Sequence, residues 1–75
     1  MIERFRTGQR IRVTAHGSTP EMNGRTGTVY RLLIKTSDAA WIAFDEDLPQ
    51  HCRRFPADDP RANHQKIYYD ECEAV

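Results

Sequence analysis

Strict alternation of apolar and polar residues is the pattern that most constrains this chain. Ile11, Val13 and Ala15 alternate with polar residues in the segment Gln9–His16, and a period of two predicts a strand with one buried face. No stretch of the sequence has a persistent 3.6-residue period, which argues against a helical fold. The 75 residues are enough for one domain with one small core, and that core has to be built from strands.

A second strand is predicted from about Arg25 to Lys35, after a loop of turn formers. Gly24 can take a positive φ in the tight exit from that loop. Gly27 lies near the start of the strand, where a residue without Cβ permits a bulge or a close backbone approach. Val29 should face inward, and the unbroken run Leu32-Leu33-Ile34 predicts a strand that bends enough to bury both of its faces in turn.

The rest of the chain holds a third strand, a long loop and two short closing strands. In the segment Ala39–Asp45, the bulky Ile42 and Phe44 fall on one side and Trp41 falls on the other. A long loop without a helix or strand pattern follows at about 45–64. The closing strands are Lys66–Tyr69 and Cys72–Val75. About five short strands predict an all-β fold, a small and strongly bent antiparallel barrel.

Two segments carry a family resemblance, Gly8-Gln-Arg-Ile-Arg-Val13 and Asn23-Gly-Arg-Thr-Gly-Thr-Val29. They resemble the KOW-type half of SH3-like barrels, in which a Gly-x-x-Val-x-Val strand and a loop precede a Gly-x-x-Gly-x-Val turn. The later Trp41–Asp45 and Tyr69–Cys72 are similar to the third strand and final turn of stand-alone bacterial barrels. The resemblance implies one SH3-like domain over residues 1–75, of the bacterial or mobile-element kind. Such barrels bind RNA in ribosomal proteins and dock on proteins elsewhere, so the fold alone does not fix a function.

The charges of the chain balance overall but not by half. The sequence holds 11 Lys and Arg against 11 Asp and Glu. Residues 1–35 carry seven bases and two acids, a net +5, while residues 36–75 carry four bases and nine acids, a net −5. Such a split predicts either a basic binding face or two halves that pack as complementary strands. The neutral total and the scarcity of lysine distinguish the chain from ribosomal KOW proteins and disfavour avid, nonspecific RNA binding.

An outer face that combines arginine with aromatic residues is the first candidate binding patch. If the first three strands form an antiparallel meander, the patch comprises Arg10, Arg12, Tyr30, Arg31 and Trp41. Such a composition is typical of protein hot spots, and it can also stack bases and hold phosphates. The alternative is structural: a bulge turns Trp41 into the core, and Tyr30 covers the end of the barrel.

The centre of the long loop is the second candidate. Arg53 and Arg54 precede Phe55, and this combination can grip a phosphate or an acidic partner while the ring inserts into a pocket. The alternative is again structural, with Phe55 packed against the barrel. In that case both arginines pair with nearby carboxylates, which are those of Asp45, Glu46, Asp58 and Asp59.

The sequence gives little support to catalytic or metal chemistry. Cys52 and Cys72 lack the close spacing of a zinc site or a disulfide scaffold, so we expect reduced thiols. The acidic turn at 45–47 lacks the oxygen spacing of a calcium loop, and no arrangement of Cys, Ser and His predicts an activated nucleophile. We therefore expect no catalytic residue, no metal and no cofactor.

Three functional hypotheses follow from the residues and the resemblance. The first is a non-enzymatic module that docks on a protein or nucleoprotein assembly through the outer face and the loop. The runner-up is direct nucleic-acid binding by the same face, with Arg25 and Arg31 on phosphates. A small oligomeric enzyme is a distant third, by fold-level analogy with a plasmid-type dihydrofolate reductase, a tetramer of small SH3-like barrels.

The expected setting of the protein follows from its apolar segments. No apolar run approaches the ~20 residues of a membrane span, and the N-terminus has no signal-peptide h-region. We therefore expect a cytoplasmic protein without membrane contact, either a monomer or a weak homodimer formed by strand edges.

Overall fold

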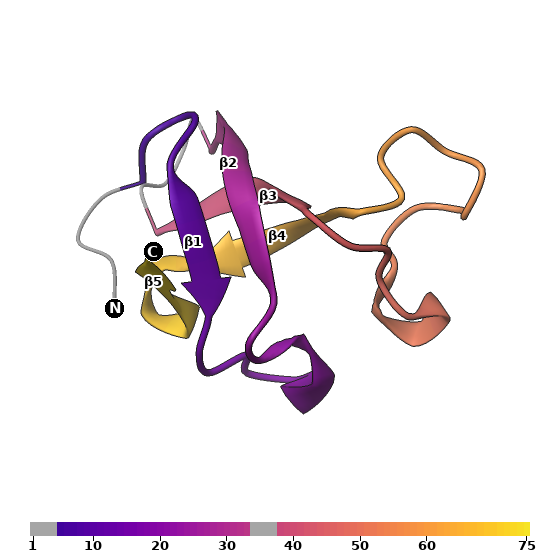
Figure 1. Ribbon diagram of the computed structural model, residues 1–75, viewed down its shortest axis with the longest axis horizontal. Coiled ribbons are helices and arrows are strands. Elements are labelled where there is room, and N and C mark those ends of the chain that lie inside the picture. Colours follow the sequence, from indigo (N-terminus) through magenta and orange to yellow (C-terminus); the bar gives the residue numbers. More distant parts are fainter. Residues whose placement is uncertain (1–4, 34–37) are drawn as a thin grey trace.

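The computed structural model describes residues 5–33 and 38–75, which fold into one antiparallel sheet (Figure 1). Its five strands are β1 Arg10–Val13, β2 Thr26–Leu32, β3 Ala39–Phe44, β4 His64–Tyr68 and β5 Cys72–Ala74, in the order β4-β3-β2-β1-β5. Short 3-10 turns interrupt the loops at η1 Pro20–Met22, η2 Gln50–Cys52 and η3 Tyr69–Glu71. The described residues contain no α-helix, and the all-β class is confirmed. Within this part of the chain, no helical segment is long and apolar enough to span a membrane.

The predicted alternation sorts side chains onto the two faces of the sheet. In β1, Ile11 and Val13 are buried while Arg10 and Arg12 are exposed. In β3, Ile42 is buried and Trp41 is only half-buried. The buried side chains form one core cluster, made of Phe5, Ile11, Val13, Met22, Val29, Ala40, Ile42, Phe44, Leu48, Cys52, Ile67 and Cys72.

Gly27 is the point of closest approach between β2 and β3. A Cβ built on this residue would lie 2.7 Å from Ile42 Cγ2 and 2.8 Å from the carbonyl oxygen of Ala43. No side chain fits in this space unless the backbone moves. The predicted close approach is confirmed, whereas the bulge lies further on, where the register shifts between Val29 and Arg31. Gly24 has φ of 88°, the positive value that the tight exit from the loop requires.

The sheet bends sharply around the core but stays open. In Figure 1, β1 and β2 cross in front of β3 and β4. Each of the two edge strands, β4 and β5, pairs with one neighbour, and they form no ladder with each other within the described chain. Closure into a barrel is therefore not confirmed.

Two predictions about strand ends are wrong. The run at Leu32-Leu33 was expected to be buried on both faces, but Leu32 is 41% exposed, because this end of β2 extends beyond the residues that pair with β1. Ile34 and Lys35, the remainder of that prediction, lie outside the described residues. The first strand was expected to span Gln9–His16, but β1 stops at Val13. The N–H groups of residues 14 and 15 both donate to the carbonyl of Glu71 instead of continuing the strand.

The long loop was expected to lack regular structure, and it is more ordered than that. Leu48 and Cys52 are buried in the common core, and Cys52 is the last residue of η2. Further along, the Asp59 N–H donates to the Pro56 carbonyl and the Ala62 N–H donates to the Asp59 carbonyl. The loop therefore projects from the sheet in Figure 1 while two of its side chains anchor it to the core.

Candidate functional site

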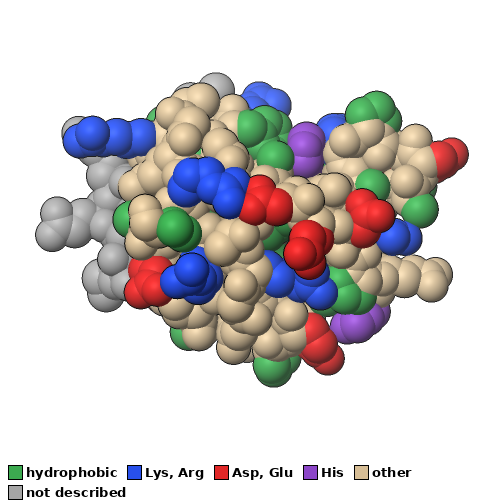
Figure 2. All heavy atoms as spheres, in the orientation of Figure 1, with side chains coloured by type: hydrophobic (Ala, Val, Ile, Leu, Met, Phe, Trp, Pro, Cys, Tyr) green, Lys and Arg blue, Asp and Glu red, His purple; other side chains and the backbone are tan. Residues whose placement is uncertain are grey.

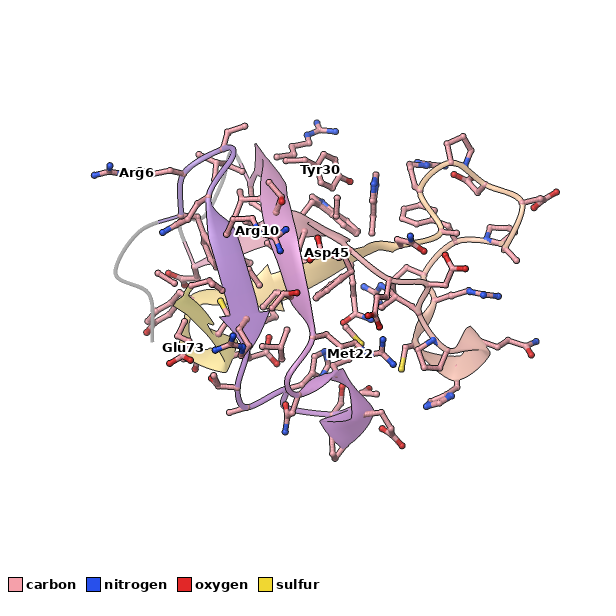
Figure 3. All side chains as sticks on the ribbon, viewed as in Figure 1. Arg6, Arg10, Met22, Tyr30, Asp45 and Glu73 are labelled. Atoms are coloured by element: carbon pink, nitrogen blue, oxygen red, sulfur yellow. The ribbon has the colours of Figure 1, made fainter. Side chains whose placement is uncertain are left out.

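Arg10, the first arginine of the predicted patch, is engaged across the sheet. Its guanidinium donates to Asp45 Oδ1 at 2.6 Å and to Thr28 Oγ1 at 2.9 Å, and Thr26 Oγ1 donates to Asp45 Oδ2 at 2.9 Å. Figure 3 shows the Arg10 and Asp45 side chains pointing toward each other. The hydrogen bonds from Arg10 and then from Thr26 lower the pKa of Asp45 to about 2. The same contact raises the pKa of Arg10.

Arg12 lies on the same face as Arg10 and contacts the neighbouring strand β5. It lies opposite Glu73 in the β1–β5 register, with 3.7 Å between Arg12 Nη1 and Glu73 Oε1. In both pairs the base comes from the basic half of the chain and the acid from the acidic half. Figure 2 accordingly shows acidic and basic side chains interspersed on this face. The charge split thus corresponds, at these two positions, to complementary strands rather than to an open basic field.

The aromatic residues of the patch lie further along the same outer face, and the long loop joins them. The Tyr30 ring is 4.2 Å from the His64 ring between centroids, and the Trp41 ring is 6.0 Å from the Phe55 ring. Arg61 lies over Phe55, with its Cζ 4.1 Å from the ring centroid. We call these five side chains the aromatic cluster. The sequence placed Trp41 and Phe55 in two separate candidate sites, and the structure brings them together.

Neighbouring acids and strands hold the aromatic cluster in place. Arg61 Nε and Nη2 each lie 3.0 Å from a carboxylate oxygen of Asp59, which lowers the pKa of Asp59. His64 is the first residue of β4, and burial, followed by the nearby charge of Arg61, lowers the pKa of its ring. In the strand register, Trp41 stands between Arg31 on β2 and Lys66 on β4.

Sequence reasoning missed Arg61, His64 and Lys66 as members of this surface. The period-two pattern could have found Lys66, because it alternates with a buried neighbour on each side. Arg61 and His64 carry no such signal, since they lie in or next to the loop and reach the face only through its path.

Arg53 and Arg54 are not part of the aromatic cluster. Together with Lys66 they line a hollow beside β4. They make no ion pair with any carboxylate that the structure describes, so the pairing alternative is wrong for both. Two of the four carboxylates that the sequence offered are used elsewhere, with Asp45 on Arg10 and Asp59 on Arg61.

The remaining candidates have structural surroundings. Arg25, a phosphate contact in the nucleic-acid hypothesis, donates from Nε to the Glu21 carbonyl at 3.3 Å. Cys52 and Cys72 are free and buried, and burial raises the pKa of both thiols, that of Cys72 to about 11. Both are protonated at neutral pH, the less nucleophilic form. The described residues include no group of three or more His, Cys, Asp and Glu placed to hold a metal ion.

Comparison of the chain with protein-family models, with curated proteins and with solved structures found no match.

Proposed function

We propose that this chain is a non-enzymatic module that docks on a protein, alone or within a nucleoprotein assembly, through the aromatic cluster and Arg31. The observation that carries the proposal is the aromatic cluster itself, where the long loop and the strands β2, β3 and β4 hold four rings on the outer face. Tyr30 remains 37% exposed and Arg31 beside it is exposed. Tyr, Trp and Arg are the residues that most often anchor protein interfaces, and Tyr and Trp bury large areas at a low cost in conformational entropy.

The state of the arginines favours a protein over a nucleic acid as the partner. Binding to phosphates draws on free cations, but Arg10 and Arg12 already face carboxylates at 2.6 and 3.7 Å. Base stacking needs an open ring face, but Trp41 is half-buried with Phe55 beside it. An outer face with paired charges around aromatic rings is better suited to a protein partner than to a nucleic acid.

The fold proposal behind this function is an SH3-like barrel of the KOW type, working in the cytoplasm. Three features support it: the three-strand meander, the 3-10 turn η3 between β4 and β5, and the return of β5 to pair with β1. A bent sheet approaches closure when its last strand pairs with its first, as β5 does with β1.

A matched pair of arginine variants tests the docking face. Immobilised wild-type, Arg31→Glu and Arg6→Glu proteins are compared for capture from an extract of the source cell, and the captured protein is then purified and titrated by calorimetry. Arg6 is exposed and points away from Tyr30 in Figure 3, so it is a control with the same change of charge. We expect Arg31→Glu to weaken binding at least about tenfold and Arg6→Glu to leave it unchanged. Equal effects of the two variants would contradict the proposed face.

Direct nucleic-acid binding is the second candidate, and one observation favours it. Arg31 and Lys66 flank Trp41 across three neighbouring strands, which is the arrangement of cations around a stacking residue. If labelled duplex or single strands bind, the affinity should fall steeply with salt, with a slope of about 0.9 per phosphate for duplex. Absence of binding at low salt removes this candidate, and loss of the captured partner after nuclease treatment would favour it over the first.

A further inference from the structure

The hollow beside β4 is lined by more basic than acidic side chains. It has a volume of about 510 Å³ and lies between the loop after β1, the η2 turn and β4. Three cationic side chains line it, those of Arg53, Arg54 and Lys66. Arg53 is half-buried, and its Nε is buried without a hydrogen-bond partner in the described structure. A buried N–H donor without a partner is costly, and an anion that accepts its hydrogen bond would remove this cost.

The one carboxylate in the wall of the hollow is already occupied. Glu71 Oε2 accepts a hydrogen bond from the Gly17 N–H at 2.7 Å, and Glu71 Oε1 accepts one from the Tyr68 N–H at 2.9 Å. Lys66 lies 5.2 Å from the Tyr68 ring centroid. The hollow therefore keeps an excess of positive charge that the described side chains do not neutralise.

The wall of the hollow is held by a chain of hydrogen bonds. His16 Nδ1 accepts from the Thr19 N–H at 3.0 Å, so the ring proton is on Nε2, which lies 2.9 Å from Gln65 Oε1. Gln65 Nε2 in turn donates to the Cys52 carbonyl at 2.7 Å. A site whose wall is fixed in advance loses less conformational entropy when a ligand binds.

The open edge of β4 adds a backbone binding position. Two bonds fix the alternation along the β3–β4 ladder: the Phe44 N–H donates to the Asn63 carbonyl, and the Tyr69 N–H donates to the Asp38 carbonyl. In an antiparallel ladder every second residue turns its N–H and C=O away from the neighbouring strand. By this count the backbone groups of Lys66 point toward the open edge.

Neighbouring contacts leave Lys66 as the free position on that edge. The Tyr68 N–H is taken by Glu71 and the His64 N–H by the carbonyl of Arg61. The N–H and C=O of Lys66 have no hydrogen-bond partner among the described residues. An extended peptide can pair with such a residue as an added strand does.

We propose that this hollow binds an extended, acidic segment of a protein partner, with its carboxylates on Arg53 and Arg54 and its backbone paired at Lys66. The site includes neither Tyr30 nor Trp41, so its binding is independent of the proposed docking face. Charge complementarity selects acidic side chains, and the single free backbone position selects a short extended contact rather than a long added strand.

A peptide titration tests the ligand class. Fluorescein-labelled hexaglutamate and hexaglutamine are titrated with the full chain by fluorescence anisotropy, beside an oligothymidylate of equal charge. We expect saturable binding of hexaglutamate with a Kd below about 1 mM, and no binding of hexaglutamine. No saturation by hexaglutamate, or tighter binding of the oligonucleotide, would overturn the proposal.

Arginine variants locate the ligand. Arg54→Gln changes an exposed residue, so it should fold normally and weaken hexaglutamate binding about tenfold, and Arg53→Gln should weaken it by at least as much. Arg6→Gln is a control that removes the same charge elsewhere and should change the Kd by less than about twofold. Equal losses in all three variants would mean nonspecific attraction and would overturn the assignment.

Amide chemical shifts then test the backbone contact. Addition of hexaglutamate should shift the Lys66 amide signal, while the amide of Thr28, which lies opposite Arg10 inside the sheet, should stay in place. Shifts centred on Tyr30 and Trp41, with none at Lys66, would place the ligand on the aromatic cluster and contradict the site proposed here.

Discussion

The meander of β1, β2 and β3 and the long loop between β3 and β4 contribute to the same core in different ways. In the meander, buried residues recur at every second position, as Ile11 and Val13 do in β1. In the loop, Leu48 and Cys52 are isolated anchors in a polar segment. A similar contrast holds for charge, because Arg10 and Arg12 face carboxylates whereas Arg53 and Arg54 pair with none among the described residues.

This difference shows what strand register does for a small domain. Register places side chains of neighbouring strands opposite each other at fixed positions, so opposite charges that share a face meet. A loop has no register, and its arginines pair only where the path of the chain brings an acid close. The path of the loop brings Arg61 to Asp59 but leaves Arg53 and Arg54 without an ion pair to a described carboxylate, so their charge is available to a partner.

The largest expected effect tests whether the loop belongs to the core. Leu48 is 1% exposed and Leu32 is 41% exposed, so the same substitution can be compared at both. Leu48→Ala should lower the free energy of unfolding by about 2 to 5 kcal/mol because it leaves a cavity, and Leu32→Ala by less than about 1 kcal/mol. Urea denaturation measures both, and equal effects would contradict the anchoring role of Leu48.

The next effect tests the packing of the meander. Gly27→Ala places a Cβ 2.7 Å from Ile42 Cγ2 and 2.8 Å from the carbonyl oxygen of Ala43, and it should destabilise the protein by about 1 to 3 kcal/mol. Gly17→Ala is the matched control, since its Cβ meets only a side-chain oxygen of Glu71 at 3.4 Å. Thermal melting compares them, and an unchanged Tm for Gly27→Ala would argue against the close approach of β2 and β3.

A smaller effect tests the charge pairing of the meander by pH. The folded pKa of Asp45, about 2, lies below its ordinary value of 3.8. The Arg10 contact therefore stabilises the fold above about pH 4, and this contribution is lost as the pH falls from 4 toward 2. Asp45→Asn should flatten that part of the stability profile, while Asp58→Asn, at an exposed loop position, should not. High salt should weaken the effect, because both partners are partly exposed.

The smallest effect probes the point where the loop meets the meander. Trp41 is the single tryptophan of the chain, and Phe55 is the loop residue beside it. Phe55→Ala should increase acrylamide quenching of Trp41 and shift its emission to the red, because the ring then meets water. Pro56→Ala, at the exposed neighbour, is the control. Equal quenching in the two variants would contradict the contact between Phe55 of the loop and Trp41 of the outer face.

Much of the meander could be predicted from the sequence because alternation directly encodes which residues face inward. Val29 is buried and Gly27 packs closely, as that pattern predicted. The anchors of the loop could not be predicted in this way. Single apolar residues such as Leu48 and Met22, within polar segments, have no period, and only the path of the chain reveals that they are buried.

The candidate surface could be predicted only in part, for a related reason. Alternation within each strand predicts which residues point to the outer face of the sheet, such as Tyr30 on β2 and Trp41 on β3. The partners of the arginines depend on how distant strands are arranged: Arg10 lies opposite Thr28 on β2 and reaches past it to Asp45 just after β3, which engages this acid. Sequence proximity suggested the opposite pairing, because it takes no account of which strands become neighbours.

The bond chain from Thr19 through His16 and Gln65 to Cys52 has a consequence for how the molecule opens. It joins three segments that are distant in the sequence, namely the loop after β1, strand β4 and the η2 turn. Because these bonds are buried or partly buried, none of the three segments can detach without breaking a bond to another. Amide hydrogen exchange at Thr19 and in η2 should therefore proceed at the slow rate of the β-sheet, with the three segments opening as one cooperative unit.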